Sequence, residues 1–173
     1  AEAVNRGEYL IPRLIRDQKR DAIEMPVGVG GARIEPRLVQ RMLNRVGDDP
    51  DQLPVLQHAL MRTWDVWAED HAENEAVDLR HFEATGGMDE ALSRHADEVY
   101  DALPSDEHRD ICRRAFQALT VKGSDNRGIR RPARLRALEE IVGGDHEKLV
   151  DVLEAFRAPG VTFLMPGVDR SLD

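Results

Sequence analysis

The chain has 173 residues, 41% of them hydrophobic and 33% charged, which is the composition of a soluble globular protein and not of a disordered one. Its formal net charge of −9 repels polyanions at long range and so disfavours general nucleic-acid binding. One cysteine excludes an intrachain disulfide framework, and no apolar run approaches the roughly 18 residues of a membrane span.

The two ends of the sequence bear on where the protein works. The chain begins at Ala1 without a methionine and stops abruptly at the sequence SLD, so we expect a piece of a longer protein. No signal peptide is visible at its start. Together with the lack of a membrane span, this predicts a cytoplasmic protein with no membrane contact.

The N-terminal part predicts an extended segment followed by a short helix and a glycine turn. Residues 8–14 read as extended, since Pro12 favours a strand end. Asp17 is predicted to cap a helix that ends at Pro26. The glycines of GVGG at 28–31 are expected to supply a turn, because the phosphate-binding pattern GxxxxGK[ST] is missing.

A long amphipathic helix over residues 51–67, DQLPVLQHALMRTWDVW, organises the first half of the chain. A helix opened by Pro36 and closed by Gly47 precedes it. Asp51 is expected to cap the long helix, and Pro54 lies in its first turn, where a missing N–H costs nothing. One face is predicted to be buried, and its members are Leu53, Leu56, Leu60, Trp64 and Trp67.

The pair Gly86 and Gly87 is the predicted boundary between two subdomains. A polar stretch at 69–78 and a short helical turn at 79–84 come before it. A helix after it is expected to bury Met88, Leu92, Ala96, Val99 and Leu103 and to end at Pro104. Ser105 then caps a helix whose inward residues are Ile111, Cys112, Ala115, Phe116 and Leu119.

The last part of the chain has the element order of a winged helix. Residues 121–128 read as a loop, and Pro132 is expected to start a short helix that buries Leu135, Leu138 and Ile141. Asp145 caps another helix, and 161–165 reads as one strand of a hairpin. The predicted fold is mainly α: a helical bundle followed by a truncated winged-helix subdomain with one short β-hairpin strand.

No catalytic centre and no metal site are predicted from the residues. None of the six histidines stands in an HExxH motif, and one cysteine cannot build a cysteine-rich zinc site. Cys112 lies in mid-helix among apolar neighbours, which is typical of a buried structural thiol.

Five arginines within 127–136 form a positive segment, and Arg130 and Arg131 are its predicted interaction residues. A helix-turn-helix would begin here, but the later helix at 146–156 has an acidic polar side with Glu147, Asp151 and Glu154. This disfavours DNA as the partner. Arginines in this place favour an acidic partner or another domain of the same chain.

Several stretches resemble the STAND-type NTPases, a class of multidomain signal-transduction ATPases. Residues 51–67 resemble the Leu-Pro-Leu signature of these proteins, and the likeness continues over 8–27, 33–50, 81–100 and 156–167. The closest likeness is to the bacterial branch, whose members often carry WD repeats.

The resemblance implies a division of the chain and a nucleotide contact. Residues 1–14 would be the tail of the NTPase core, 15–86 a helical lid and 87–173 an incomplete winged helix. Pro54 matches the lid proline that packs on adenine, with Leu53 beside it. Gln52 stands where the family usually has glycine or another small residue. ATP or ADP and Mg²⁺ would be bound by the parent protein, since Walker A and Walker B are not in this sequence.

The resemblance therefore implies a regulatory nucleotide-switch module that closes over ATP or ADP and couples nucleotide state to domain rearrangement. Its partners would be the NTPase core and the effector domains of the same chain, and oligomerisation of the parent stays open. Two alternatives remain: a winged-helix DNA-binding regulator and a nucleotide-independent protein-interaction scaffold. The fragment itself is not expected to be an enzyme.

Overall fold

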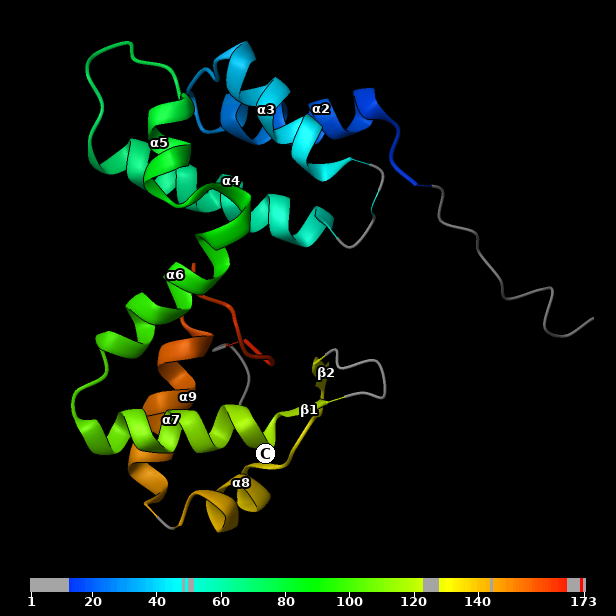
Figure 1. Ribbon diagram of the computed structural model, residues 1–173. Coiled ribbons are helices and arrows are strands. Elements are labelled where there is room, and N and C mark those ends of the chain that lie inside the picture. The colour runs from blue at the N-terminus through cyan, green and yellow to red at the C-terminus, as the bar shows by residue number, and fades with distance from the viewer. Residues whose placement is uncertain are drawn as a thin grey trace, which may run out of the picture. The chain divides into compact units, whose positions relative to one another are not determined.

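The computed structural model describes residues 13–47, 49, 52–122, 128–143, 145–167 and 172. This part of the chain contains eight helices, α2 to α9, and one two-stranded sheet (Figure 1). The chain divides into two compact units, Ala1–Arg94 and His95–Asp173. The predicted fold class, mainly α, is confirmed. The assignment of a lid and a winged helix to parts of the chain stays a prediction.

The first unit is a helical bundle. It consists of α2 (Arg16–Val29), α3 (Pro36–Val46), α4 (Gln52–Glu69), α5 (Leu79–Ala84) and the start of α6 (Gly87–Asp101). Every third or fourth residue of α3 is buried, which places one whole face in the core. An isolated parallel bridge joins Ile34 and Val77 and ties the loop before α3 to the loop before α5. The buried core comprises Ile23, Val27, Leu38, Val39, Met42, Leu43, Val46, Leu56, Ala59, Leu60, Val77, Phe82, Met88 and Ala91.

Helix α2 is longer than predicted. It begins at Arg16, with Ile15 instead of Asp17 at the cap position, and it continues through Pro26 to Val29. A proline inside a helix removes one hydrogen bond. Ile23 and Val27 lie one turn apart and are both buried, so apolar burial on this face offsets that loss. The predicted helix end at Pro26 is therefore wrong.

The predicted burial of two helix faces needs correction. In α4 the buried residues are Leu56, Ala59, Leu60 and Thr63, while Leu53, Trp64 and Trp67 are half-buried at the edge of the core. In α6 the predicted core residue Leu92 is 44% exposed. Ala91 and His95 are buried instead. Met88 and Leu103 are buried as predicted, so the prediction failed only at the middle of α6, where a small residue and a polar residue face inward.

The second unit packs α7 (Asp106–Ala118), α8 (Leu135–Val142) and α9 (His146–Arg157) against each other (Figure 1). The Ser105 side chain accepts a hydrogen bond from the backbone N–H of His108, and Asp145 does the same for Lys148, so both predicted caps are confirmed. Helix α8 begins at Leu135 and not at Pro132. Its buried residues are Leu138 and Val142, and Ile141 is exposed, contrary to the prediction.

A short hairpin stands where a loop was predicted. Strand β1 (Thr120–Lys122) pairs with β2 (Gly128–Arg130) in antiparallel register. The backbone N–H of Arg131 donates to Leu119 O over 2.8 Å and extends the ladder by one bond. The alternation Thr-Val-Lys and Gly-Ile-Arg around a Gly-Ser-Asp-Asn stretch is the hairpin signal that the loop interpretation overlooked.

The strand predicted at 161–165 is wrong. The backbone N–H groups of Phe163 and Leu164 both donate to Phe156 O, at 2.9 and 3.1 Å, and so fold this segment back on the end of α9. These two N–H groups already have a partner in α9, so they are not available to pair with a neighbouring strand. The predicted extended segment at 8–14 lies largely outside the described residues, as does the predicted cap Asp51.

Candidate functional site

The predicted nucleotide contact lies in the first turn of α4. The helix begins with a hydrogen bond from Gln52 N to Asp49 O over 3.2 Å, and Pro54 is its third residue. A proline there gives up an N–H that would have no partner in the helix. The sequence therefore fixes a rigid apolar ring at the start of a core helix.

Leu53 and Pro54 divide two roles between them. Leu53 is half-buried and packs against the core of the first unit, whereas Pro54 is exposed. An apolar ring held at the surface by a buried neighbour is suited to contact a flat apolar group, such as a nucleobase, through dispersion. It offers no charge and no side-chain hydrogen bond, so it could hold a ligand only as one wall of a larger site.

The end of α2 packs against the second half of α4 through a close glycine contact. A Cβ atom added at Gly30 would come within 2.4 Å of the Trp64 ring in α4. Trp64 in turn lies with its ring centre 4.9 Å from that of Trp67. Gly30 is therefore required because a ring lies against its Cα, which supports a packing role for the GVGG stretch. Gly31 has a φ of +82° and makes the turn itself.

A buried lysine ties α2 to the end of α3. Lys19 is 8% exposed, and its ammonium donates to the carbonyl oxygen of Gly47, the residue that closes α3. Cations are favoured at helix C-termini, where unpaired carbonyls carry partial negative charge. This contact fixes the point where the chain leaves α3 for α4, although residues 48, 50 and 51 of the connection lie outside the described part.

A polar network on the first unit has no counterpart in the sequence-based expectations. The guanidinium of Arg80 donates to both carboxylate oxygens of Glu75, over 2.6 and 2.7 Å. The hydrogen bonds from Arg80 lower the pKa of Glu75 to about 2. Arg37 donates to Asp78, which also caps α5. These groups hold the 70–78 loop in place, and each has a protein partner.

His81 is the fully buried member of this network. Its Nδ1 accepts a hydrogen bond from Asp78 N over 3.0 Å, which leaves Nε2 as the protonated nitrogen of the neutral ring. Among the described residues Nε2 has no hydrogen-bond partner, and it lies 3.6 Å from a carboxylate oxygen of Glu75. Burial lowers the pKa of His81, so the ring is held in its neutral form.

The predicted interaction residues Arg130 and Arg131 belong to the second unit. Arg130 closes β2 and pairs with Thr120, and both arginine side chains are exposed. Leu53 and Pro54 belong to the first unit, so the predicted nucleotide residues and the predicted interaction residues lie on different units. The backbone of Arg131 is held by its hydrogen bond to Leu119 O. Its guanidinium contacts no partner among the described residues.

Two groups in the second unit invite a catalytic interpretation that their geometry does not favour. The Ser105 hydroxyl lies 2.8 Å from His108 Nδ1, and His108 Nε2 lies 3.6 Å from Asp151. The same hydroxyl accepts from His108 N as a helix cap, and Asp151 is too far for a hydrogen bond that would orient the ring. Burial raises the pKa of Cys112 to about 11, which keeps the thiol protonated and unreactive.

Within the described ranges, no group of three or more His, Cys, Asp or Glu side chains gathers in a way that could hold a metal ion. In the same part of the chain, no helix combines the length and apolarity needed to cross a membrane.

Comparison with known proteins places the chain in a family. Residues 1–160 match the family described as Novel STAND NTPase 1, and the chain belongs to this family of STAND NTPases. Membership implies the context of a P-loop NTPase. Neither a curated protein nor a solved structure gives a match.

Proposed function

We propose that this chain is the regulatory switch region of a STAND NTPase, and that it closes over ATP or ADP bound by a P-loop core of the same polypeptide. Membership of the STAND family over residues 1–160 is the observation that carries the proposal. The exposed ring of Pro54 beside half-buried Leu53 supports it, because this is the geometry that an adenine contact requires.

The contact would transmit nucleotide state because α4 belongs to the core. Leu56 and Leu60, one and two turns after Leu53, are buried against the other helices of the first unit. A displacement of the first turn would therefore move these buried residues and so affect the packing of the bundle. Phosphate and Mg²⁺ ligands would come from the core, since Walker motifs are not in this sequence.

The proposal predicts little nucleotide affinity for the 173-residue chain alone. Packing of adenine on one apolar ring contributes on the order of 1–2 kcal/mol by area. Micromolar affinity needs about 8 kcal/mol. Titration calorimetry of the chain with ATP should therefore show no micromolar binding, and a micromolar Kd would mean that the phosphate ligands lie in this region after all.

The decisive test uses the longer polypeptide that carries the P-loop. Pro54→Ala should release radiolabelled ADP about 5- to 30-fold faster in a filter-binding assay, which is the rate equivalent of losing the adenine contact of about 1–2 kcal/mol. Gln57→Ala is the matched control, because Gln57 is an exposed residue of the same helix. Equal release rates for the two variants would remove Pro54 from the nucleotide site.

A further inference from the structure

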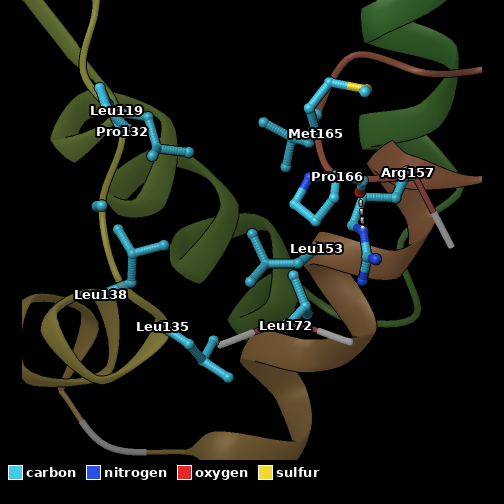
Figure 2. A pocket seen from close by; sticks show the side chains of 11 residues that line it. Leu119, Pro132, Leu135, Leu138, Leu153, Arg157, Met165, Pro166 and Leu172 are labelled. Carbon is cyan, nitrogen blue, oxygen red and sulfur yellow. Dashed lines mark hydrogen bonds between the residues drawn. The ribbon is translucent and has the colours of Figure 1, made fainter. Parts of the chain in front are cut away.

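The second unit contains an apolar pocket at the edge of its hydrophobic core, which the proposed switch does not use. Its volume is about 260 Å³, and it lies among the end of α7, the start of α8, the end of α9 and the segment at 164–166 (Figure 2). Leucines and a proline supply most of the lining: Leu119, Pro132, Leu135, Leu138, Leu153 and Leu164. Small-molecule sites usually measure about 300–1,000 Å³. This pocket is smaller and matches one or two aliphatic side chains.

One wall of the pocket is held rigidly by Arg157. This side chain is 2% exposed, and its Nε and Nη2 donate to the carbonyl oxygens of Pro166 and Gly167, each over 2.6 Å. Figure 2 shows the bond to Pro166 at the edge of the pocket. The wall is therefore built into the fold, and a ligand would not have to order it. At the same wall Met165 is 81% exposed, a large apolar side chain left at the surface.

Three arginines are close in sequence to residues of the opposite wall. Pro132 and Ala133 line the pocket, and their chain neighbours Arg131 and Arg134 are exposed, as is Arg130. Among the described residues, none of these three guanidiniums forms an ion pair or side-chain hydrogen bond. A chain of net charge −9 thus keeps a cluster of uncompensated positive charge beside its apolar pocket.

We propose that this pocket binds an acidic peptide segment, which inserts an aliphatic side chain between the leucines and sets its carboxylates against Arg130, Arg131 and Arg134. Guanidinium groups bind carboxylates through paired, charge-assisted hydrogen bonds. The buried anchor would supply affinity, and the arginines would select acidic sequences and speed association.

The apolar lining favours a peptide over a nucleic acid, because a duplex has no aliphatic side chain to fill the pocket. The acids on the polar side of α9, Glu147, Asp151 and Glu154, would repel a duplex and an acidic peptide alike, so they do not decide between the two. The proposal does not depend on nucleotide binding, so its test contains no ATP or ADP and can fail or succeed on its own.

The test is calorimetry on the 173-residue chain with a helical peptide of about 16 residues that carries leucines on one face and glutamates elsewhere. Two control peptides replace the leucines by serines or the glutamates by lysines. A duplex of about 20 base pairs is the fourth probe. The leucine–glutamate peptide should bind at least about tenfold more tightly than the other three at physiological salt. No binding of this peptide, or equal binding of any other probe, overturns the proposal.

Two further measurements locate the site. Arg131→Glu with Arg134→Glu should weaken binding about tenfold, whereas the matched pair Arg13→Glu with Arg113→Glu, exposed arginines with the same charge change, should leave it within about twofold. With 13C-labelled methionine methyl groups, the Met165 signal should shift on binding. The signal of Met25, 65% exposed in the first unit, should not. Equal effects of the two pairs, or an unmoved Met165 signal, would refute the site.

Discussion

The two units present their candidate contact residues in opposite ways. In the first unit, Leu53 and Pro54 are part of a core helix, and the residues one and two turns further along α4 are buried. In the second, Arg130 and Arg131 lie at the end of a two-stranded hairpin with exposed side chains. A ligand on the first site must act on the bundle, whereas a partner on the second can be gained or lost without a cost in folding. Substitutions should separate these two cases.

The largest effect is expected beneath the predicted nucleotide contact. Leu56→Ala should lower the free energy of unfolding by about 2–5 kcal/mol, because Leu56 is only 2% exposed and its truncation leaves a cavity in the core. Gln57→Ala, its exposed neighbour, should change the value by less than about 0.5 kcal/mol. Urea denaturation followed by circular dichroism measures both. Similar midpoints for the two would show that α4 is not anchored in the core.

The contact between Gly30 and Trp64 should come next. Gly30→Ala places a methyl group within 2.4 Å of the ring, and overpacking of this kind costs about 1–3 kcal/mol. Gly28→Ala is its matched control, since nothing lies within 4 Å of the added Cβ. That change should raise the free energy of unfolding by about 0.4–1 kcal/mol, because alanine reduces the conformational entropy of the unfolded chain. The opposite order of stability would mean that the ring moves aside at no cost.

The stability of the first unit should fall as pH drops below about 6.5. Burial lowers the pKa values of His81 and His58, so the unfolded chain binds protons that the folded unit does not. Each histidine can add at most about 1.4 kcal/mol per pH unit to the slope. The contribution is fully present above the unfolded pKa and is lost on acidification.

His81→Gln tests this dependence, because glutamine keeps the acceptor for Asp78 N but cannot titrate. Denaturation between pH 5.5 and 7.5 should show a shallower slope for this variant than for His71→Gln, a change at an exposed position. The window stays above the range in which Glu75, with a pKa of about 2, gains its proton. An unchanged slope would indicate that His81 does not govern the response.

The smallest effect is expected at the exposed arginines. Arg130→Ala and Arg131→Ala should each leave the unfolding free energy within about 0.5 kcal/mol of the parent, because neither side chain has a partner in the described structure. The backbone bond from Arg131 N to Leu119 O survives the change. A loss above about 1 kcal/mol in a thermal melt would assign these residues to the fold and weaken the contrast between the units.

Sequence patterns predicted best where one local rule determines the structure. The caps at Ser105 and Asp145 and the core positions Ile111, Cys112 and Ala115 follow from short-range capping and helical periodicity, and the structure confirms them. The mainly α fold rests on the same periodicity.

Predictions failed where long-range contacts outweigh local preference. Pro26 should end a helix by its own chemistry, but burial of Ile23 and Val27 carries α2 past it. The apolar run 161–165 has the composition of a strand, but its donors bond to the end of α9. The apolar pocket could not be foreseen, because it is assembled from residues of different elements. The contact of His81 with Asp78 is a local capping box that the sequence-based interpretation overlooked. The roles of Pro54 and Arg131 stay predictions, since burial and exposure alone do not name a ligand.

The two tryptophans of the chain, Trp64 and Trp67, lie three residues apart in α4. Tryptophan fluorescence of the protein therefore originates from a single helix of the first unit, whereas the second unit contains Tyr100 but no tryptophan. With selective excitation of tryptophan, the emission should respond to unfolding of the first unit. The molecule thus carries a natural optical label on one of its two units, and comparison of emission with circular dichroism would reveal whether the units unfold together.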